Sequence, residues 1–484
     1  MKKSIGINTI FNVAYKLLNI IFPLITSAYL ARILGPSYIG KVDYSRNIMS
    51  YFLVVASMGI PTYGMREIAK ARNDANKKNR IFTELIVLNG LFSTICSIAY
   101  TICIFFVDKF HANYKLYLCT GITLFMNIIN VDWVYSGDEE YVYMSTRSFI
   151  VKIISIACIF LFVQNQSDYI FYALITSLAT TGNYILNVIN LKKHVRLIFS
   201  NLSFRRHFKP IIILFVTLLA SDLYNQIDIT MLGFHYDDAV IGYYSNGVKL
   251  IRIVYSITIA VGSTIMPRMC LYYKEKSNIE YSNLFWKTFW VVILCAFPSS
   301  IGLFMVADDT VSVLFGNQFL PTITVIKILT PIIIIISVSY LIGSVVLTST
   351  NNEKYLLCAT LLGAITNIVL NVILIPRFST TGAAIASLIG EFIVLMVHFT
   401  YGRKYVNGLI NFKELVKIFL SLGVMIIFVL GARILCSSTF IRLILSIFMG
   451  FLGYVITLII TRSEITIYIL HKIISKAQVW KIEK

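Results

Sequence analysis

Long apolar runs recur along the whole chain, each about 20 residues long and separated by short polar segments. Because a helix rises about 1.5 Å per residue, such a run crosses the roughly 30 Å of hydrocarbon in a bilayer. The pattern therefore predicts an all-α polytopic membrane protein with about 14 transmembrane helices. We place the spans at 5–32, 40–62, 81–107, 114–135, 143–163, 169–190, 208–233, 239–266, 284–306, 321–347, 354–375, 381–401, 414–435 and 441–461.

Composition supports this class. Hydrophobic residues make up 57% of the 484 positions and charged residues only 13%, whereas a soluble chain carries about 25% charged residues. The first apolar stretch is too long for a signal peptide and lacks a small-residue cleavage site, so we expect it to be the first span. None of the eight cysteines forms a CxxC pair, and we expect neither a disulfide nor a metal site.

Basic residues are concentrated on one side of the predicted membrane. Clusters lie at 66–80 and 192–209, in even-numbered loops, whereas the opposite loops hold only Lys109 and Arg377 clear of a span. The positive-inside rule then places both termini in the cytoplasm. The net charge of +19 is mostly an orientation signal or a lipid headgroup contact, so we expect membrane lipids and no nucleic acid as partners.

A weak internal repeat indicates how the spans are grouped. LGPSYIGKVDYS (34–45) aligns with LGFHYDDAVIGYYS (232–245), and GDEEY (137–141) resembles NNEKY (351–355). Two halves of six spans with two additional spans fit this spacing, as in many secondary transporters. We predict a six-helix bundle at 1–190, a cytoplasmic linker at 191–207, a second bundle at 208–402, two additional helices at 403–461 and a cytoplasmic tail at 462–484.

Charged residues deep inside the spans are the strongest functional signal. A cation in mid-bilayer costs at least about 2.5 kcal/mol and rarely serves packing alone. The five deepest cations are Lys16, Arg46, Lys249, Arg252 and Lys327, against three clearly intramembrane acids, Asp222, Asp228 and Glu391. This surplus favours a cavity that holds an anion, because a guanidinium grips phosphate with two parallel hydrogen bonds and an ammonium acts as a point charge.

Polar stripes accompany the cations. Asn12 and Asn19 share the first span with Lys16, and Asn225 lies on the seventh span between the two aspartates. Such side chains either line a cavity or hold helices together by hydrogen bonds. Glu391 and His398 lie two turns apart on one helix face; they either relay protons or each bond a neighbouring polar side chain, and we favour the second interpretation.

Enzyme motifs are missing. The chain has no phosphate-binding loop, HExxH, GxSxG or Cys/His cluster. The outward loops are short, the longest being about 307–320, so no extramembrane domain is expected to hold an active site. We therefore predict no catalytic residue, no cofactor and no enzymatic activity.

Two stretches resemble a known family. YLARILGPSYIGKVDYSRNIMSYFLVVASMGIPTYGMREIAKAR (29–72) and PRFSTTGAAIASLIGE (376–391) resemble the Wzx-type O-antigen and capsule flippases of the multidrug/oligosaccharidyl-lipid/polysaccharide exporter superfamily. The resemblance implies a MATE-like, V-shaped pair of six-helix bundles whose central cavity opens alternately to the two faces of the bacterial cytoplasmic membrane. The implied substrate is a sugar repeat unit on undecaprenyl pyrophosphate. Related lipid II flippases hold pyrophosphate with basic residues in spans one, two and eight, which implies this role for Lys16, Arg46 and Arg252.

The leading hypothesis is thus a flippase for lipid-linked oligosaccharide repeat units, with the basic cavity residues neutralising the pyrophosphate. The expected partners are this substrate, membrane lipids and the polysaccharide polymerase machinery. Alternatives are a cation-coupled multidrug exporter, which would have an acidic cavity, and a lipid II flippase. A membrane-embedded glycosyl polymerase or ligase is disfavoured by the short outer loops.

Overall fold

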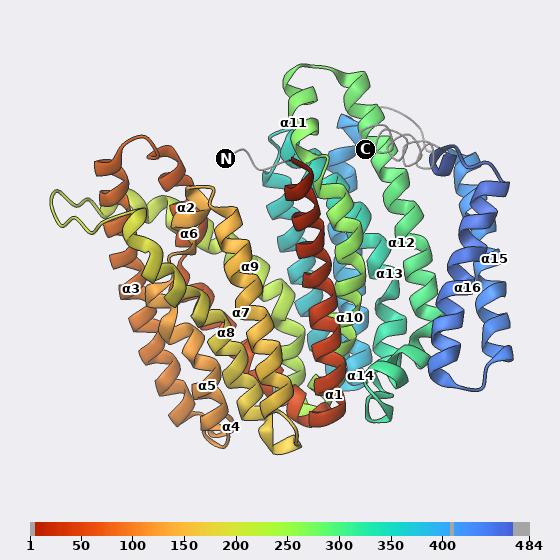
Figure 1. Cartoon of the computed structure of the whole chain (residues 1–484), viewed down its shortest axis with the longest axis horizontal. Helices are drawn as coiled ribbons and strands as arrows, with labels where there is room; N and C mark the ends of the chain where they lie inside the picture. Colours follow the sequence, from red (N-terminus) through yellow and green to blue (C-terminus); the bar gives the residue numbers. More distant parts are fainter. Residues whose placement is uncertain (1–4, 407–410, 468–484) are drawn as a thin grey trace. The chain divides into compact units, whose positions relative to one another are not determined.

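A computed structural model describes residues 5–406 and 411–467 (Figure 1). Side chains are described from residue 24 onward. Within these residues the regular structure is entirely helical. The α-helices are α1 (Ile5–Ser57), α2 (Ile60–Lys70), α3 (Ala75–Phe106), α4 (Asp108–His111), α5 (Tyr114–Phe125), α6 (Asp132–Gly137), α7 (Tyr141–Phe162), α8 (Tyr169–Asn190), α9 (Arg205–His235), α10 (Asp238–Ser263), α11 (Met266–Lys274), α12 (Asn278–Leu314), α13 (Thr322–Tyr340), α14 (Lys354–Gly402), α15 (Phe412–Leu435) and α16 (Thr439–Ile460). Short 3-10 turns are η1 (Met126–Ile129), η2 (Gln166–Asp168), η3 (Leu191–Lys193), η4 (Asn317–Phe319) and η6 (Arg403–Tyr405), and η5 (Leu341–Leu347) is a π-helix.

The all-α polytopic membrane class is confirmed. Ten helices in the described part of the chain are long and apolar enough to cross a membrane. Two of these contain two predicted spans each, because the backbone breaks inside α1 at Gly35 (φ 73°) and inside α14 at Ser379 (φ 52°). Of the remaining predicted spans, 114–135 corresponds to a shorter apolar helical segment, and 169–190 corresponds to α8, which is not among the ten. The number fourteen therefore stays a prediction.

The chain divides into two compact units, Met1–Gly242 and Tyr243–Lys484, so that the boundary falls inside α10. In the first unit, α2, α3 and α6 enclose a core around Trp133. In the second unit, α12, α15 and α16 share a core around Leu422 and Tyr454. The bundle and linker boundaries predicted from the sequence remain predictions.

The two copies of the sequence repeat pack against each other at a backbone contact. A methyl group on Gly40 of the first copy would come within 1.6 Å of the Asp238 carbonyl oxygen in the second. Reciprocally, a methyl group on Gly242 would come within 2.1 Å of the Pro36 carbonyl oxygen. The glycines of the shared Ile-Gly step therefore let the start of α10 and the second half of α1 approach more closely than any side chain allows.

A lysine lies beside this crossing. Lys109, in the short helix α4, donates a hydrogen bond to the Gly233 carbonyl, and its ammonium lies 4.4 Å from the centroid of the Tyr44 ring. Burial lowers the pKa of the Lys109 ammonium, whereas the charges of Asp238 and Asp237 oppose this shift. The predicted outer loops of the first unit thus contain a lysine that binds the backbone next to the glycine crossing.

The segment between α8 and α9 is bonded to the start of α3. Its backbone amides at Arg196, Ile198 and Ser203 donate to the side chains of Asn79 (2.8 Å), Thr83 (3.0 Å) and Glu84 (2.6 Å). A second group of contacts ends on the same carboxylate: Glu84 is fully buried and lies 2.5 Å from Arg206 and 2.7 Å from the His207 imidazole. Polar residues at the start of an otherwise apolar helix therefore hold the predicted cytoplasmic linker in place.

Replacing Gly40 with alanine should disrupt the crossing. The new methyl group would meet backbone atoms, which cannot rotate away, so overpacking should cost about 1–3 kcal/mol or more. The expected result is a lower melting temperature of the purified protein and a lower yield of folded protein. Gly302 is the control, because it lies in helix α12 and the methyl group of an alanine there would meet no atom within 4 Å; its alanine variant should be neutral or slightly more stable. Equal behaviour of the two variants would contradict the crossing.

Replacing Glu84 with alanine should destabilise the first unit. It leaves the Ser203 amide and the His207 imidazole without their carboxylate partner, and losing one partner of a buried pair costs about 3–5 kcal/mol. Thermal unfolding in detergent measures the effect. Glu67 on α2 is a suitable control because its pair with Lys70 lies at the surface; Glu67→Ala should cost under about 1 kcal/mol. Equal destabilisation by both substitutions would refute a special role for Glu84.

Candidate functional site

Arg46 lies half-buried on the second half of α1 and points toward α8. Its guanidinium donates to the Tyr172 hydroxyl (3.0 Å) and to the Thr176 hydroxyl, and its central carbon lies 4.5 Å from the centroid of the Tyr172 ring. Within the described residues, Arg46 forms no ion pair. These neutral groups orient the guanidinium without cancelling its charge, so it can still attract an anion.

A ladder of polar contacts joins the same part of α1 to α9. The Asn47 amide donates to the Gln226 carbonyl (2.9 Å) and to its side-chain oxygen (3.1 Å), and the Thr230 hydroxyl donates to Asn47 (2.6 Å). One turn further along α1, Ser50 donates to Asp222 over 3.4 Å. Polar side chains of predicted spans two and seven therefore face each other, and they fix the helix that carries Arg46.

The other predicted residues of α9 take different positions. Asp228 is buried, whereas Asn225 is exposed and donates to the Ser221 carbonyl of its own helix over 2.7 Å. On α1, the side chains of Asn12, Lys16 and Asn19 lie outside the described residues. Of the predicted residues in the first unit, the structure thus brings Asp222 into the polar ladder next to the helix turn that carries Arg46.

In the second unit, α10 carries Lys249 and Arg252, which are half-buried and exposed, respectively. Arg252 and Glu391 of α14 both lie close enough to Tyr255 for their charges to act on its hydroxyl. A hydrogen bond of 3.0 Å between Tyr244 and the Ser387 hydroxyl also connects these two helices. A predicted cation and a predicted acid, far apart in sequence, therefore lie within electrostatic range of the same tyrosine.

His398 is buried between α14 and the end of α13. Its Nδ1 lies 2.8 Å from the Ser339 hydroxyl, while Nε2 is buried without a hydrogen-bond partner. The ring lies directly on Gly343, where a methyl group would come within 2.4 Å of it. Gly343 belongs to the π-helical segment η5, a rare geometry that is frequent at functional sites. The neighbouring polar group of His398 in this structure is thus a serine on another helix.

Lys327 belongs to a network of ion pairs rather than to the polar groups described above. Its ammonium lies 2.9 and 3.1 Å from the two carboxylate oxygens of Asp308, which also lies 3.4 Å from Arg433. The adjacent Asp309 is buried and binds Arg442 through both carboxylate oxygens. The network therefore joins α12 and α13 to the two additional helices, α15 and α16. The sequence did contain a signal for this network. It was the acidic pair Asp308 and Asp309 at the end of one span, together with single arginines at the adjoining ends of the last two spans.

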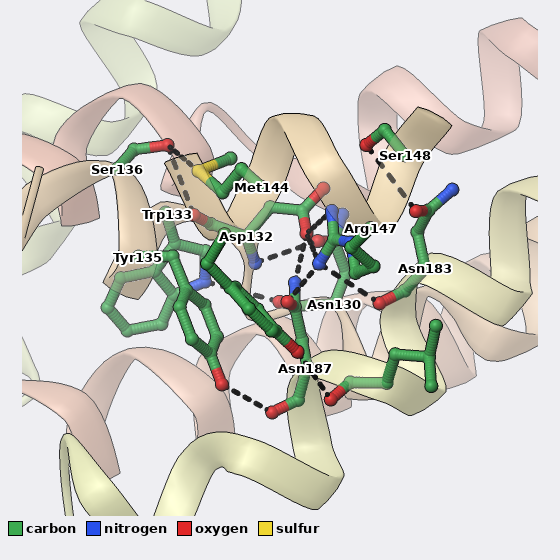
Figure 2. A network of polar contacts seen from close by, with 12 residues as sticks. Asn130, Asp132, Trp133, Tyr135, Ser136, Met144, Arg147, Ser148, Asn183 and Asn187 are labelled. Atoms are coloured by element: carbon green, nitrogen blue, oxygen red, sulfur yellow. Dashed lines mark hydrogen bonds and ion pairs between the residues drawn. The ribbon is translucent and has the colours of Figure 1, made fainter. Parts of the chain in front are cut away.

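Figure 2 shows a buried charge that the sequence reasoning missed. Arg147 of α7 is only 6% exposed; both terminal nitrogens lie 3.4 Å from one Asp132 oxygen, and one donates to the Asn183 carbonyl over 3.2 Å. Asn187 bonds to both Arg147 and Asp132, and its carbonyl accepts from Tyr135 over 2.6 Å. The available sequence signal was the pair of asparagines in predicted span six, Asn183 and Asn187, but the residues that they contact lie on α6 and α7.

The sequence of the chain resembles those of known proteins. Residues 5–273 match the family described as polysaccharide biosynthesis proteins. The chain belongs to this family. An Escherichia coli K12 protein named as an O-antigen transporter is 24% identical over 416 residues, 83% of this chain and 98% of that protein. A Haloferax volcanii protein named as a low-salt glycan biosynthesis flippase is 24% identical over 240 residues, 49% of this chain and 51% of that protein.

Solved structures show the same fold. The lipid II flippase MurJ in an inward closed conformation superposes with a TM-score of 0.77 at 17% identity, covering 94% of this chain and all of that one. An inward-facing multidrug resistance MATE family transporter of the MOP superfamily gives a TM-score of 0.62 at 12% identity, covering 82% of this chain and 97% of that one. The polysaccharide biosynthesis family member described here therefore has the MATE- and MurJ-like fold that the resemblance predicted.

A double-mutant cycle on Lys327 and Asp308 separates pairing from substrate binding. Both side chains are about one-third exposed, so the pair should contribute about 0.2–1 kcal/mol to stability. We expect Lys327→Gln to lower the melting temperature slightly, and much less so when Asp308→Asn is also present. Transport should survive in the double variant. Loss of transport in Lys327→Gln, with no change in stability and no recovery in the double variant, would instead assign Lys327 to the substrate.

Proposed function

We propose that this chain is a flippase for oligosaccharide repeat units linked to undecaprenyl pyrophosphate, destined for O-antigen, capsule or a similar polysaccharide. It would move them from the cytoplasmic to the outer leaflet by alternating access through a cationic cavity. Family membership and the names of the relatives in E. coli and H. volcanii support this class of substrate. The carrying observation is Arg46, an intramembrane guanidinium oriented by two hydroxyl groups and by no described carboxylate.

Arg46 has the chemistry that a pyrophosphate group requires. The planar guanidinium offers parallel N–H donors to two phosphate oxygens, and such charge-assisted bonds are about twice as strong as neutral ones. Low dielectric surroundings strengthen the attraction further. Arg147 has the same chemistry, but Asp132 lies beside it. This contrast in partners makes Arg46 the better anion ligand of the two.

The remaining predicted residues complete the proposal. Lys16, Lys249 and Arg252 would neutralise further phosphate charge, and Asn12, Asn19 and Asn225 would bond sugar hydroxyls. Asp222, Asp228, Glu391 and His398 would exchange ion pairs or protons as the cavity changes its access. Lys327 would contribute least, because Asp308 already neutralises it.

The proposed reaction is translocation, with no bond made or broken and no ATP hydrolysed. We place the protein in the bacterial cytoplasmic membrane with both termini inside, as supported by the basic loops on one side. Its partners would be the lipid-linked substrate, membrane lipids and the polymerase machinery that receives the repeat units.

Substitution of Arg46 in cells that lack the chromosomal copy tests the proposal. Losing a hydrogen-bonded charge worth about 1.5–3 kcal/mol should reduce flipping roughly 10- to 150-fold for Arg46→Ala. Arg46→Glu should abolish it, while Arg46→Lys should retain part of it. The measurements are surface polysaccharide and the amount of lipid-linked repeat unit on the cytoplasmic leaflet, at equal membrane expression.

The control is Arg66→Ala, which removes an exposed arginine of α2 and should leave flipping unchanged. A wild-type amount of surface polysaccharide in cells that carry Arg46→Glu would contradict the anion-cavity mechanism. Rescue of cells that lack their lipid II flippase, without any effect on lipid-linked repeat units, would reassign the substrate.

A further inference from the structure

The two ends of α14 meet in an aromatic stack. Tyr355, at its first turn, and Tyr401, at its last, have ring centroids 3.8 Å apart and ring planes inclined by only 12°. They come together because the helix folds back at Ser379, where φ is 52°. Both ends of this double span therefore emerge on the same face of the membrane, where tyrosines commonly occupy the headgroup level.

Two lysines converge on this stack. The Lys354 ammonium lies 5.1 Å from the Tyr355 centroid, and that of Lys404 lies 5.9 Å from the same centroid and 5.0 Å from that of Tyr405. Tyr401 covers one face of the Tyr355 ring, which leaves the other face and the rim to the two ammonium groups. Both lysines are exposed, as is the adjacent Arg403.

The aromatic part of this cluster is held in place before any ligand arrives. The Asn352 amide donates to the Tyr405 hydroxyl (2.9 Å) and to the Thr350 carbonyl (2.7 Å). The turn between η5 and α14 is tight, with Asn351 at φ 57°. Tyr405 also packs against the apolar core that contains Leu341 and Val345. The Tyr405 ring is therefore held in place, whereas the two lysines are exposed.

Like charges that share one ring repel each other, and an anion placed between them removes this repulsion. Lysine stems pack on apolar surface while the ammonium reaches the headgroup region. An exposed acid, Glu353, lies next to Lys354, but the three cations leave the cluster net positive. A mere orientation signal would not require two lysines, one at the start of a 49-residue helix and one just beyond its end, to share one aromatic ring.

We propose that Lys354, Lys404, Tyr355 and Tyr405 form a binding site for the phosphate group of an anionic phospholipid at the membrane interface. The two ammonium groups bind the phosphate, the tyrosine rings lie at the level of the headgroup, and Arg403 adds to the local potential. This site is independent of the proposed flippase activity, since it uses none of the residues assigned to the substrate.

Binding of dioctanoyl phosphatidylglycerol to the purified full chain, counted by native mass spectrometry, tests the site. Each cation near an anionic lipid surface contributes about 1 kcal/mol, or roughly five-fold in affinity. The variant Lys354→Gln/Lys404→Gln should therefore bind about 25-fold more weakly at this site. The charge-retaining variant Lys354→Arg/Lys404→Arg should bind as the wild type does. If the glutamine variant does not fold, the arginine variant is measured in its place, and weaker binding by it would contradict a site that depends on charge.

The matched control is Lys192→Gln/Lys193→Gln, which removes two adjacent exposed lysines from η3 in the other unit. An equal loss of phosphatidylglycerol in this control would mean that only net charge matters and would overturn the site. Wild-type protein should prefer phosphatidylglycerol to phosphatidylcholine, and the glutamine variant should lose this preference. If millimolar inorganic phosphate displaces the lipid, the ligand is a soluble phosphate and the lipid assignment fails.

Discussion

Hydrocarbon offers no partner to an ionised side chain, so the protein itself must supply one, and this constraint organises the charged residues described above. Arg147 is paired with Asp132 and bonded to Asn183 and Asn187, and Lys327 is paired with Asp308. Arg46 is different, because hydroxyl groups orient it without neutralising it. A charge that is fully paired stabilises a helix contact, whereas one that is only oriented retains the capacity to bind an anion. The partners of each cation, rather than its position in a span, therefore distinguish charges that are already neutralised from charges that can still attract an anion.

The surroundings of Arg46 are fixed by contacts that have little to do with its charge. The asparagine, glutamine and threonine ladder attaches α1 to α9. Near one end of this part of α1, the Gly40 and Gly242 contact brings two backbones together, and beyond α8 the linker is bonded to the start of α3. The same principle operates in the second unit, where Asp309 and Arg442 attach α16 to α12. Polar side chains thus serve mainly as positioning contacts in both units.

The spans and the polar stripes could be predicted well because both depend on local sequence. The break at Gly35 and the backbone contact at Gly40 also left a trace, since the two repeat copies carry the same Leu-Gly and Ile-Gly steps. The role of Lys327 was harder to foresee, because its acid comes from the preceding helix and further partners of the network come from the last two. Arg147 was missed because its partners, Asp132 and two asparagines, come from two other helices. The stack of Tyr355 on Tyr401 had no signature, since it depends on α14 folding back at a serine.

The sequence by itself determined the membrane class, the approximate positions of the spans, the family and the residue types available for binding an anion. It could do so because the cost of placing a residue in hydrocarbon is largely local and adds up along a segment. Only the tertiary structure decided which of those residues are neutralised, because a salt bridge such as Asp309 with Arg442 joins positions 133 residues apart. Pairing depends on which helix faces pack together, and this packing is a property of the whole chain rather than of any one span.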